Sequence, residues 1–140
     1  QALVDACQTM LRPPVSMVGI PAMRKIAREI AGWPQELGEE TAAKCLRQVC
    51  EYLNSPPDLE GNHLTAGRDL TIAFLQEAGM LAGLDFSMPI HWLNKSMDAI
   101  PDLAEAIYRN DLAAAAGLFD RVADMETEAY QQLSRIVNHI

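Results

Sequence analysis

The sequence has no apolar run that approaches the roughly 18 residues of a transmembrane helix. It shows no leader in which basic residues precede an apolar stretch. It also lacks internal repeats, low-complexity segments and any β-type alternation of useful length. These absences argue against a membrane-spanning or β-rich protein, and they predict an all-α fold that does not associate with a membrane.

Motifs that hold metals or nucleotides are missing as well. None of the three histidines, His63, His91 and His139, has another ligand residue four positions away, and no H-E-x-x-H is present. There is no G-x-G-x-x-G and no phosphate loop. We therefore expect no metal and no cofactor.

Cysteine is scarce, with three residues and no C-x-x-C spacing. An odd number of cysteines at these spacings argues against a disulfide framework and favours a reducing compartment, so we expect a cytoplasmic protein. Cys7 and Cys50 lie in apolar helical patterns and are interpreted as core residues. A Cys–His nucleophile pair stays open as an alternative, because such partners meet in space rather than in sequence.

Basic residues are outnumbered, with 11 Lys and Arg against 19 Asp and Glu, for a net charge of −8. Residues 1–50 hold 6 basic and 5 acidic residues, whereas residues 51–140 hold 5 and 14. Such an acidic chain repels phosphate backbones and anionic lipid surfaces. We therefore expect neither a nucleic-acid partner nor a membrane partner.

What the sequence does contain is helical periodicity over most of its 140 residues. The pattern predicts one domain over residues 1–140, a compact bundle of about six or seven helices. Proline, glycine and capping residues place the helices at about 1–11, 21–33, 39–53, 65–82, 87–100, 101–110 and 112–139, with Ser87 and Asp111 as N-caps.

The predicted helix near 65–82 is apolar on two faces. Leu70, Phe74 and Leu81 form one face, and Ile72 and Leu75 form another. A helix that is apolar on two sides is usually packed on two sides, so we expect it to be central.

Two charged residues break the apolar pattern. Glu126 lies in the apolar seam of the long last helix, and Arg68 shares a face with Ile72 and Leu75. A buried carboxylate normally needs a partner. We expect Arg68 and Glu126 to lie close together or to line one polar pocket. The alternative is that the bundle opens there and both groups reach water.

The stretch "PPVSMVGIPAMRKIAREIAGWPQEL" (residues 13–37) resembles the start of the helical C-terminal domain of butirosin biosynthesis protein H-like proteins. Gly19, Ile20, Trp33 and Pro34 stand at the positions of that family's pattern. Further along, "AGRDLTIAFLQEAGML" and "HWL" continue the resemblance, which spans nearly the whole chain. The residues that carry it there are Arg68, Phe74, Leu75, Glu77, Ala78, Trp92, Glu126 and Glu128.

One loop departs from the family pattern. The glycines that precede the arginine in the family are replaced by Leu64, Thr65 and Ala66, and only Gly67 is kept. If that turn allows a close approach to the backbone, this chain has altered it.

The resemblance implies a helical accessory domain, the C-terminal part of a larger protein, that packs on a papain-like catalytic half. The family's known member is an acyltransferase, which moves an aminoacyl chain from an acyl carrier protein thioester to an aminoglycoside amine. Its catalytic cysteine and histidine belong to the papain-like half, so no catalytic residue is assigned here. The candidates for substrate or domain-interface contacts are Arg68, Glu126, His63 and Trp92.

The partners that follow from the resemblance are a papain-like catalytic domain or subunit and, through that half, an acyl carrier protein. Carrier proteins are usually acidic, so the acidic residues 51–140 disfavour direct docking, and the face with Arg24, Lys25 and Arg28 is the one exception. Two other hypotheses remain. One is a free-standing helical module for protein–protein interaction, with homo-oligomers open. The weaker one is a small helical enzyme built on Arg68, Glu126 and His63.

Overall fold

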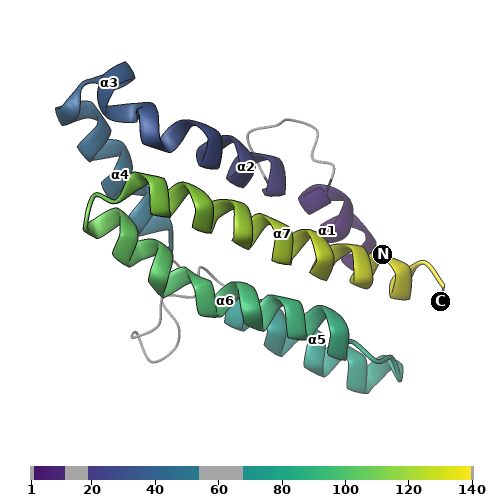
Figure 1. The fold of residues 1–140 in the computed structure, drawn as a ribbon. Helices are drawn as coiled ribbons and strands as arrows, with labels where there is room; N and C mark the ends of the chain where they lie inside the picture. The colour runs from purple at the N-terminus through teal and green to yellow at the C-terminus, as the bar shows by residue number, and fades with distance from the viewer. Residues whose placement is uncertain (1, 12–18, 54–67, 140) are drawn as a thin grey trace.

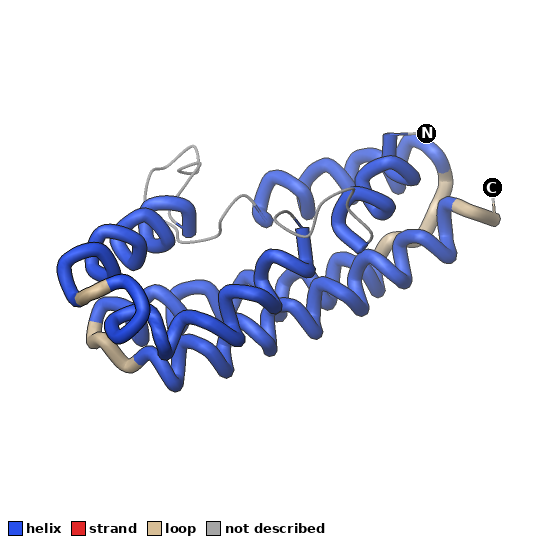
Figure 2. The backbone as a smooth tube through the Cα atoms, turned by 90° about the horizontal axis from the view of Figure 1, so that it is seen from above, coloured by secondary structure: helices blue, strands red, loops and turns tan. Residues whose placement is uncertain are grey.

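The computed structural model describes residues 2–11, 19–53 and 68–139, and these ranges are helical apart from short turns (Figures 1 and 2). No strand occurs within them, and no described helix is both long and apolar enough to cross a membrane. The predicted all-α fold is confirmed. Its elements are α1 (Ala2–Leu11), α2 (Gly19–Glu29), the 3-10 helix η1 (Ile30–Gly32), α3 (Trp33–Leu37), α4 (Glu39–Leu53), α5 (Arg68–Ala82), α6 (Ser87–Tyr108) and α7 (Leu112–Val137).

The long helix α7 forms the centre of the bundle. It packs against α6, α2, α1 and η1, and Figure 1 shows it running between α2 and α6. The apolar spacing in the sequence predicts a seam formed by Leu112, Ala115, Phe119, Val122, Glu126, Ala129, Leu133, Ile136 and Ile140. These residues are buried as far as Leu133, but the next buried residue is Val137 rather than Ile136. Steps of three and four average 3.5 residues per turn, whereas the helix has 3.6, so the buried stripe drifts by one position at its end.

Two apolar clusters pack along α6 and α7. The first includes Ile30, Leu103 and Phe119, and gathers α2, η1 and α4 onto the turn between α6 and α7. The second includes Leu75 and Leu93, and gathers α1 and α5 onto the other end of the same two helices. The bundle therefore has two cores, with α6 and α7 common to both.

Helix α5 lies on the outside of the bundle, although its pattern predicts a central helix. Its Ile72 and Leu75 are buried against α6, whereas Leu70, Phe74 and Leu81 are exposed. The two apolar faces are real, but among the described residues only one of them is covered. The sequence pattern shows that two sides of the helix are apolar. It does not show that residues of the same chain cover both sides.

Helix α6 runs unbroken from Ser87 to Tyr108, so the predicted boundary at Pro101 is wrong. Pro101 is exposed inside the helix, where its ring removes the N–H that would bond the carbonyl four residues earlier. Leu93, Ile100 and Leu103 are buried on both sides of the proline. Burial of this continuous apolar face outweighs the local cost of the proline.

Replacing Pro101 with alanine should therefore stabilise the protein by about 2 kcal/mol, because the N–H returns and the ring clash disappears, while the unfolded chain gains some freedom. Urea unfolding followed by circular dichroism measures the change. Pro34→Ala is the matched control, since Pro34 lies in the first turn of α3, where its N–H is not needed. Equal effects of the two substitutions would contradict this account of Pro101.

The predicted second helix ends earlier than expected. Regular α-helix stops at Glu29, η1 follows, and Trp33 keeps helical angles (φ −57°, ψ −42°) at the start of α3. Because a proline disfavours helical geometry in the residue before it, Pro34 is expected to end a helix near Trp33. Trp33 is nevertheless helical, and Pro34 lies in the first turn of a new helix. Trp33 packs against the first core cluster, which offsets the cost of helical geometry before a proline.

Capping agrees with the sequence at one of two predicted sites. Asp111 caps α7, since its Oδ1 accepts from the N–H of Ala114 at 3.1 Å. At α6 the predicted cap is wrong, because the N-cap residue is Phe86, whose side chain makes no capping hydrogen bond. The N–H of Ser87 instead donates to Asp85 Oδ1 at 2.9 Å. Hydrogen bonds from the side chain and backbone of Ser87 lower the pKa of Asp85.

Candidate functional site

The two charged residues that break the apolar pattern meet inside the bundle. Arg68 is the first residue of α5, and Glu126 lies midway along α7. Arg68 Nε donates to Glu126 Oε1 at 2.5 Å, and the two side chains are 10% and 1% exposed. The predicted proximity of Arg68 and Glu126 is thus confirmed, and the alternative in which both reach water is excluded.

A third residue, which is not among the predicted site residues, completes this cluster. Ser96 on α6 is fully buried, and its Oγ donates to Glu126 Oε1 at 3.1 Å. The signal was present, because Ser96 is the one polar residue in the buried stripe of α6. A buried hydroxyl in such a stripe indicates a hydrogen-bond partner on the facing helix.

Two buried polar atoms near this level of α6 and α7 have no hydrogen-bond partner in the described part of the chain. One is Glu126 Oε2 and the other is Trp92 Nε1. Trp92 lies one helical turn before Ser96 on α6. Unsatisfied buried groups are rare in native proteins and mark places where a water molecule or another group is expected.

The surroundings of Trp92 are partly cationic. Lys95 Nζ lies 5.1 Å from the centre of the indole ring, and His91 meets the ring edge-on at 5.5 Å between ring centres. His63, the remaining predicted site residue, lies outside the described residues. The structure thus brings Arg68 and Glu126 together, adds Ser96, and places Trp92 on the helix that carries Ser96.

This cluster is suited to holding α5, α6 and α7 in fixed positions relative to one another. Glu126 binds the guanidinium of Arg68 and the hydroxyl of Ser96 through one oxygen, and its other oxygen can accept a further hydrogen bond. The three side chains come from α5, α6 and α7, so the cluster ties the outer helix to the central pair.

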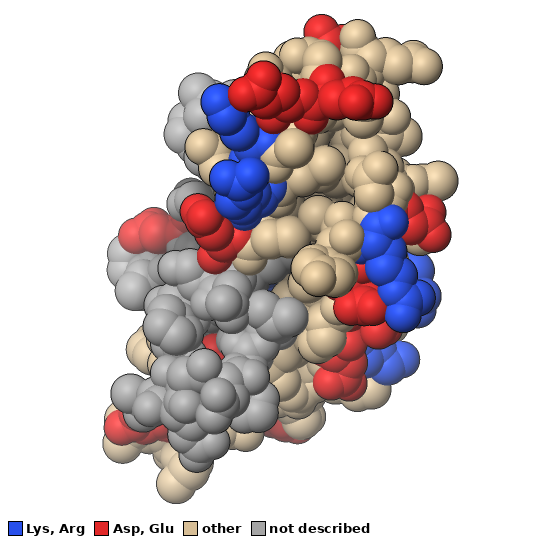
Figure 3. Space-filling model, turned by 90° about the vertical axis from the view of Figure 1, so that its left-hand side faces the viewer, with Lys and Arg blue, Asp and Glu red and all other residues tan. Residues whose placement is uncertain are grey.

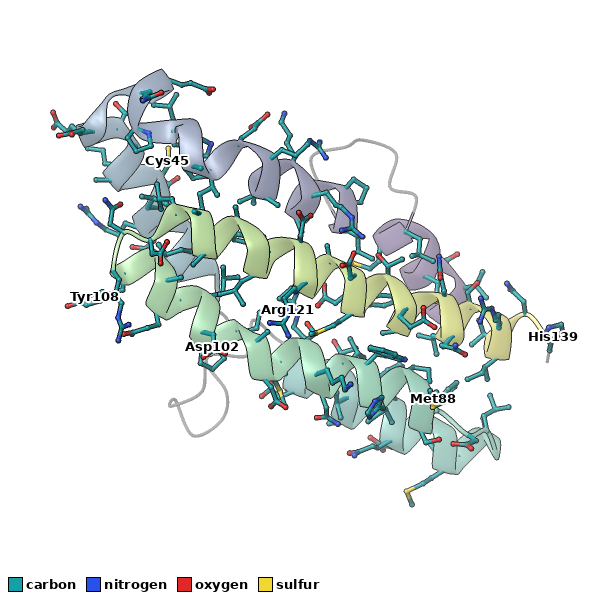
Figure 4. All side chains as sticks on the ribbon, viewed as in Figure 1. Cys45, Met88, Asp102, Tyr108, Arg121 and His139 are labelled. Carbon is teal, nitrogen blue, oxygen red and sulfur yellow. The ribbon has the colours of Figure 1, made fainter. Side chains whose placement is uncertain are left out.

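The environment of two of the cysteines disfavours nucleophilic chemistry. Burial raises the pKa of the Cys7 and Cys50 thiols, which opposes thiolate formation. Cys45 and His139 lie at opposite ends of the molecule (Figure 4). Within the described ranges, no group of three or more His, Cys, Asp or Glu residues is placed to hold a metal ion.

Charge on the surface is mixed in the view that shows the α3–α4 end. In Figure 3, the basic and acidic side chains of the described residues lie beside one another rather than in separate fields. Arg109 and Glu105, which form an exposed ion pair at 2.7 Å, are an example of neighbouring side chains with opposite charges. Among the described residues visible in this view, the two signs of charge are therefore mixed.

A family model described as "Domain of unknown function (DUF4872)" matches residues 1–56. The match spans α1 to α4, so α5, α6 and α7, which carry the buried charged cluster, lie beyond it. No curated protein and no solved structure matches the chain.

Proposed function

We propose that this chain is the helical accessory domain of a butirosin biosynthesis protein H-like acyltransferase. In this role it packs on a papain-like catalytic half and shapes the site that receives the acyl acceptor. The acyl group comes from a carrier-protein thioester and passes to an amine in the biosynthesis of a natural product. The observation that carries the proposal is the uncovered apolar face of α5.

That face consists of large side chains in helical register. Leu70 is 52% exposed, Phe74 53% and Leu81 83%. They lie on the side of α5 opposite Ile72 and Leu75, which are buried. A row of exposed apolar side chains along one helix indicates a surface that another protein covers.

The buried charged cluster supports the same role. Arg68 stands at the start of α5, so its ion pair with Glu126 fixes one end of the helix against α6 and α7. The outer face of α5 is thereby presented on a rigid support. A rigid apolar helix face loses little conformational entropy when a partner binds it.

We expect Leu70→Asp combined with Leu81→Asp to weaken association with the papain-like catalytic half at least about tenfold, because each change leaves a charge at an apolar contact. The two parts are co-purified and their affinity is measured by calorimetry. Leu37→Asp combined with Tyr108→Asp is the control, since both residues are exposed but belong to α3 and the end of α6.

The outcomes separate the alternatives. If the control pair weakens binding as much as the α5 pair, the α5 face is not the interface. If the catalytic half does not bind the chain at all, the accessory role fails. Self-association through α5, detected by light scattering and abolished by the same α5 pair, would instead favour a free-standing interaction module without catalysis.

A further inference from the structure

A carboxylate lies inside the exposed apolar row of α5. Leu70, Phe74, Glu77 and Leu81 follow the spacing i, i+4, i+7 and i+11, which places them on one side of the helix. At roughly 100° per residue, their directions around the helix axis span only about 60°. Glu77 is exposed, as are its three apolar neighbours in the row. The outer face of α5 therefore carries a charge near its middle.

Glu77 has no cationic partner in the described part of the chain. Residues 69–90 contain neither Lys nor Arg, so no side chain one turn away on α5 can pair with it. The ion pairs formed among the described residues do not include it either. The buried residues of α5 point to the opposite side, toward α6. The carboxylate is therefore balanced by solvent as long as the face stays uncovered.

Covering this face changes the environment of Glu77. A surface that contacts Phe74 and Leu81 together also removes water from Glu77, because the carboxylate stands between them along the helix. An ionised carboxylate that loses water without gaining a partner is strongly destabilising. The covering surface must therefore supply a cationic group at the position of Glu77.

The charges that flank the row have the same sign. Asp69 precedes Leu70 and Asp85 follows Leu81, and with Glu77 they are the only charged residues of the segment 69–90. A surface that is apolar in its centre and basic around it is complementary to this pattern. The outer face of α5 thus calls for a partner of positive charge.

A second copy of the chain does not meet this requirement. An antiparallel pairing of two α5 helices that aligns Leu70 with Leu81 places Glu77 against Phe74 of the other copy. A parallel pairing places the two Glu77 side chains together. Neither arrangement brings a cation to the carboxylate, and a net charge of −8 on each copy adds repulsion.

The charge pattern also distinguishes α5 from the cavity of about 870 Å³ between α1, α2 and α7. The described lining of that cavity includes Arg24, Lys25, Arg28 and Arg135, and no acidic side chain. A basic partner surface would meet like charge there. Such a partner is therefore directed to α5.

We propose that the protein that covers α5 presents an apolar groove with an Arg or Lys side chain facing Glu77. The resulting ion pair lies in the middle of the apolar contact and fixes its register, because a shift by one helical turn separates the two charges. The inference rests on the function proposed above, in which the groove belongs to the papain-like half, and it specifies the chemistry of that groove.

Glu77→Leu separates a paired from an unpaired carboxylate by the sign of its effect. If Glu77 is paired, the substitution leaves the partner's cation alone in an apolar contact, so affinity for the papain-like half should fall at least about tenfold. If Glu77 is unpaired, leucine extends the apolar row and affinity should rise. We expect the fall, measured by calorimetry.

Glu29→Leu is the matched control. It makes the same change in charge and side chain at an exposed position of α2, on the other side of α7 from α6 (Figure 1). We expect this variant to bind as the unchanged chain does. Circular dichroism melts confirm that both variants fold.

Glu77→Gln gives a second readout. It keeps the shape of the side chain and removes its charge, so it should weaken association and also reduce the dependence of affinity on salt concentration. Calorimetry of the unchanged chain and of this variant at low and high salt measures the difference.

The outcomes separate this inference from the accessory role. Binding by the unchanged chain, with equal or tighter binding by Glu77→Leu, would overturn the ion pair and leave the accessory role intact. An equal loss in Glu29→Leu would also overturn it, since net charge alone would then explain the effect. If the unchanged chain does not bind the papain-like half, the accessory role fails and this inference falls with it.

Discussion

Glu126→Gln and Arg68→Met should each lower the free energy of unfolding by about 3–5 kcal/mol, because each leaves a buried charge without its partner. The ion pair is 2.5 Å long, and Glu126 is 1% exposed, so water cannot replace the lost contact. Chemical denaturation of each variant measures the loss. In Glu126→Gln, the side-chain oxygen of glutamine can still accept the hydrogen bond from Ser96. The loss of stability therefore comes mainly from the broken ion pair with Arg68.

The double variant should lose less than the sum of the two single losses, since contacting residues are not additive. Arg109→Met and Glu105→Gln form the matched control cycle. That pair has a similar separation of 2.7 Å, but its side chains are 72% and 55% exposed, so its coupling should stay below about 1 kcal/mol. Single losses below 1 kcal/mol at Arg68 and Glu126 would show that the buried pair is not a constraint on stability.

Gly79→Ala should destabilise the protein by about 2 kcal/mol, although alanine is the better helix former. A Cβ at Gly79 would lie 2.9 Å from the carbonyl oxygen of Leu84 and 3.2 Å from the ring of Phe86. The N–H of Leu84 donates to the carbonyl of Gly79 at 3.0 Å, with Gly83 in the left-handed conformation (φ 66°). The chain thus folds back tightly over Gly79 at the end of α5, and a side chain there would push it away.

Gly117→Ala is the control for Gly79→Ala. It lies inside α7 and is exposed, and a Cβ there meets nothing within 4 Å. We expect a gain of about 0.5–1 kcal/mol at this position from helix propensity alone. Thermal and urea unfolding compare the two variants, and a gain at both positions would contradict the close packing of the α5–α6 turn.

The sequence predicted most of the helices because their signals are local. Asp111 at the start of α7 and Glu39 at the start of α4 stand where helices begin, and the apolar spacing of α7 identified its buried face. Pro101 was predicted to begin a new helix because proline interrupts helices locally. In the folded protein, burial of the continuous apolar face of α6 outweighs that local effect. The position of α5 was misread because periodicity carries no information about which face finds a neighbour.

Part of the candidate site was also predictable from local signals in the sequence. Arg68 and Glu126 are visible as charges in apolar stripes, and charge complementarity pairs them. Ser96 is a weaker signal, since serine is often found in helices without a buried role. The cavity lined by α1, α2 and α7 could not be predicted, because its lining residues are brought together only when α1 and α2 pack against α7.

The short connection between α6 and α7 also has a consequence for the order of folding. The two helices are joined through Arg109–Asp111, so their contacts close a small loop and are expected to form early. That hairpin places Glu126 opposite Ser96, but the guanidinium arrives only when α5 docks. Until then the carboxylate must stay hydrated, and the middle of the hairpin cannot close around it. We therefore expect dry closure of the α6–α7 hairpin and docking of α5 to occur as one step, late in folding.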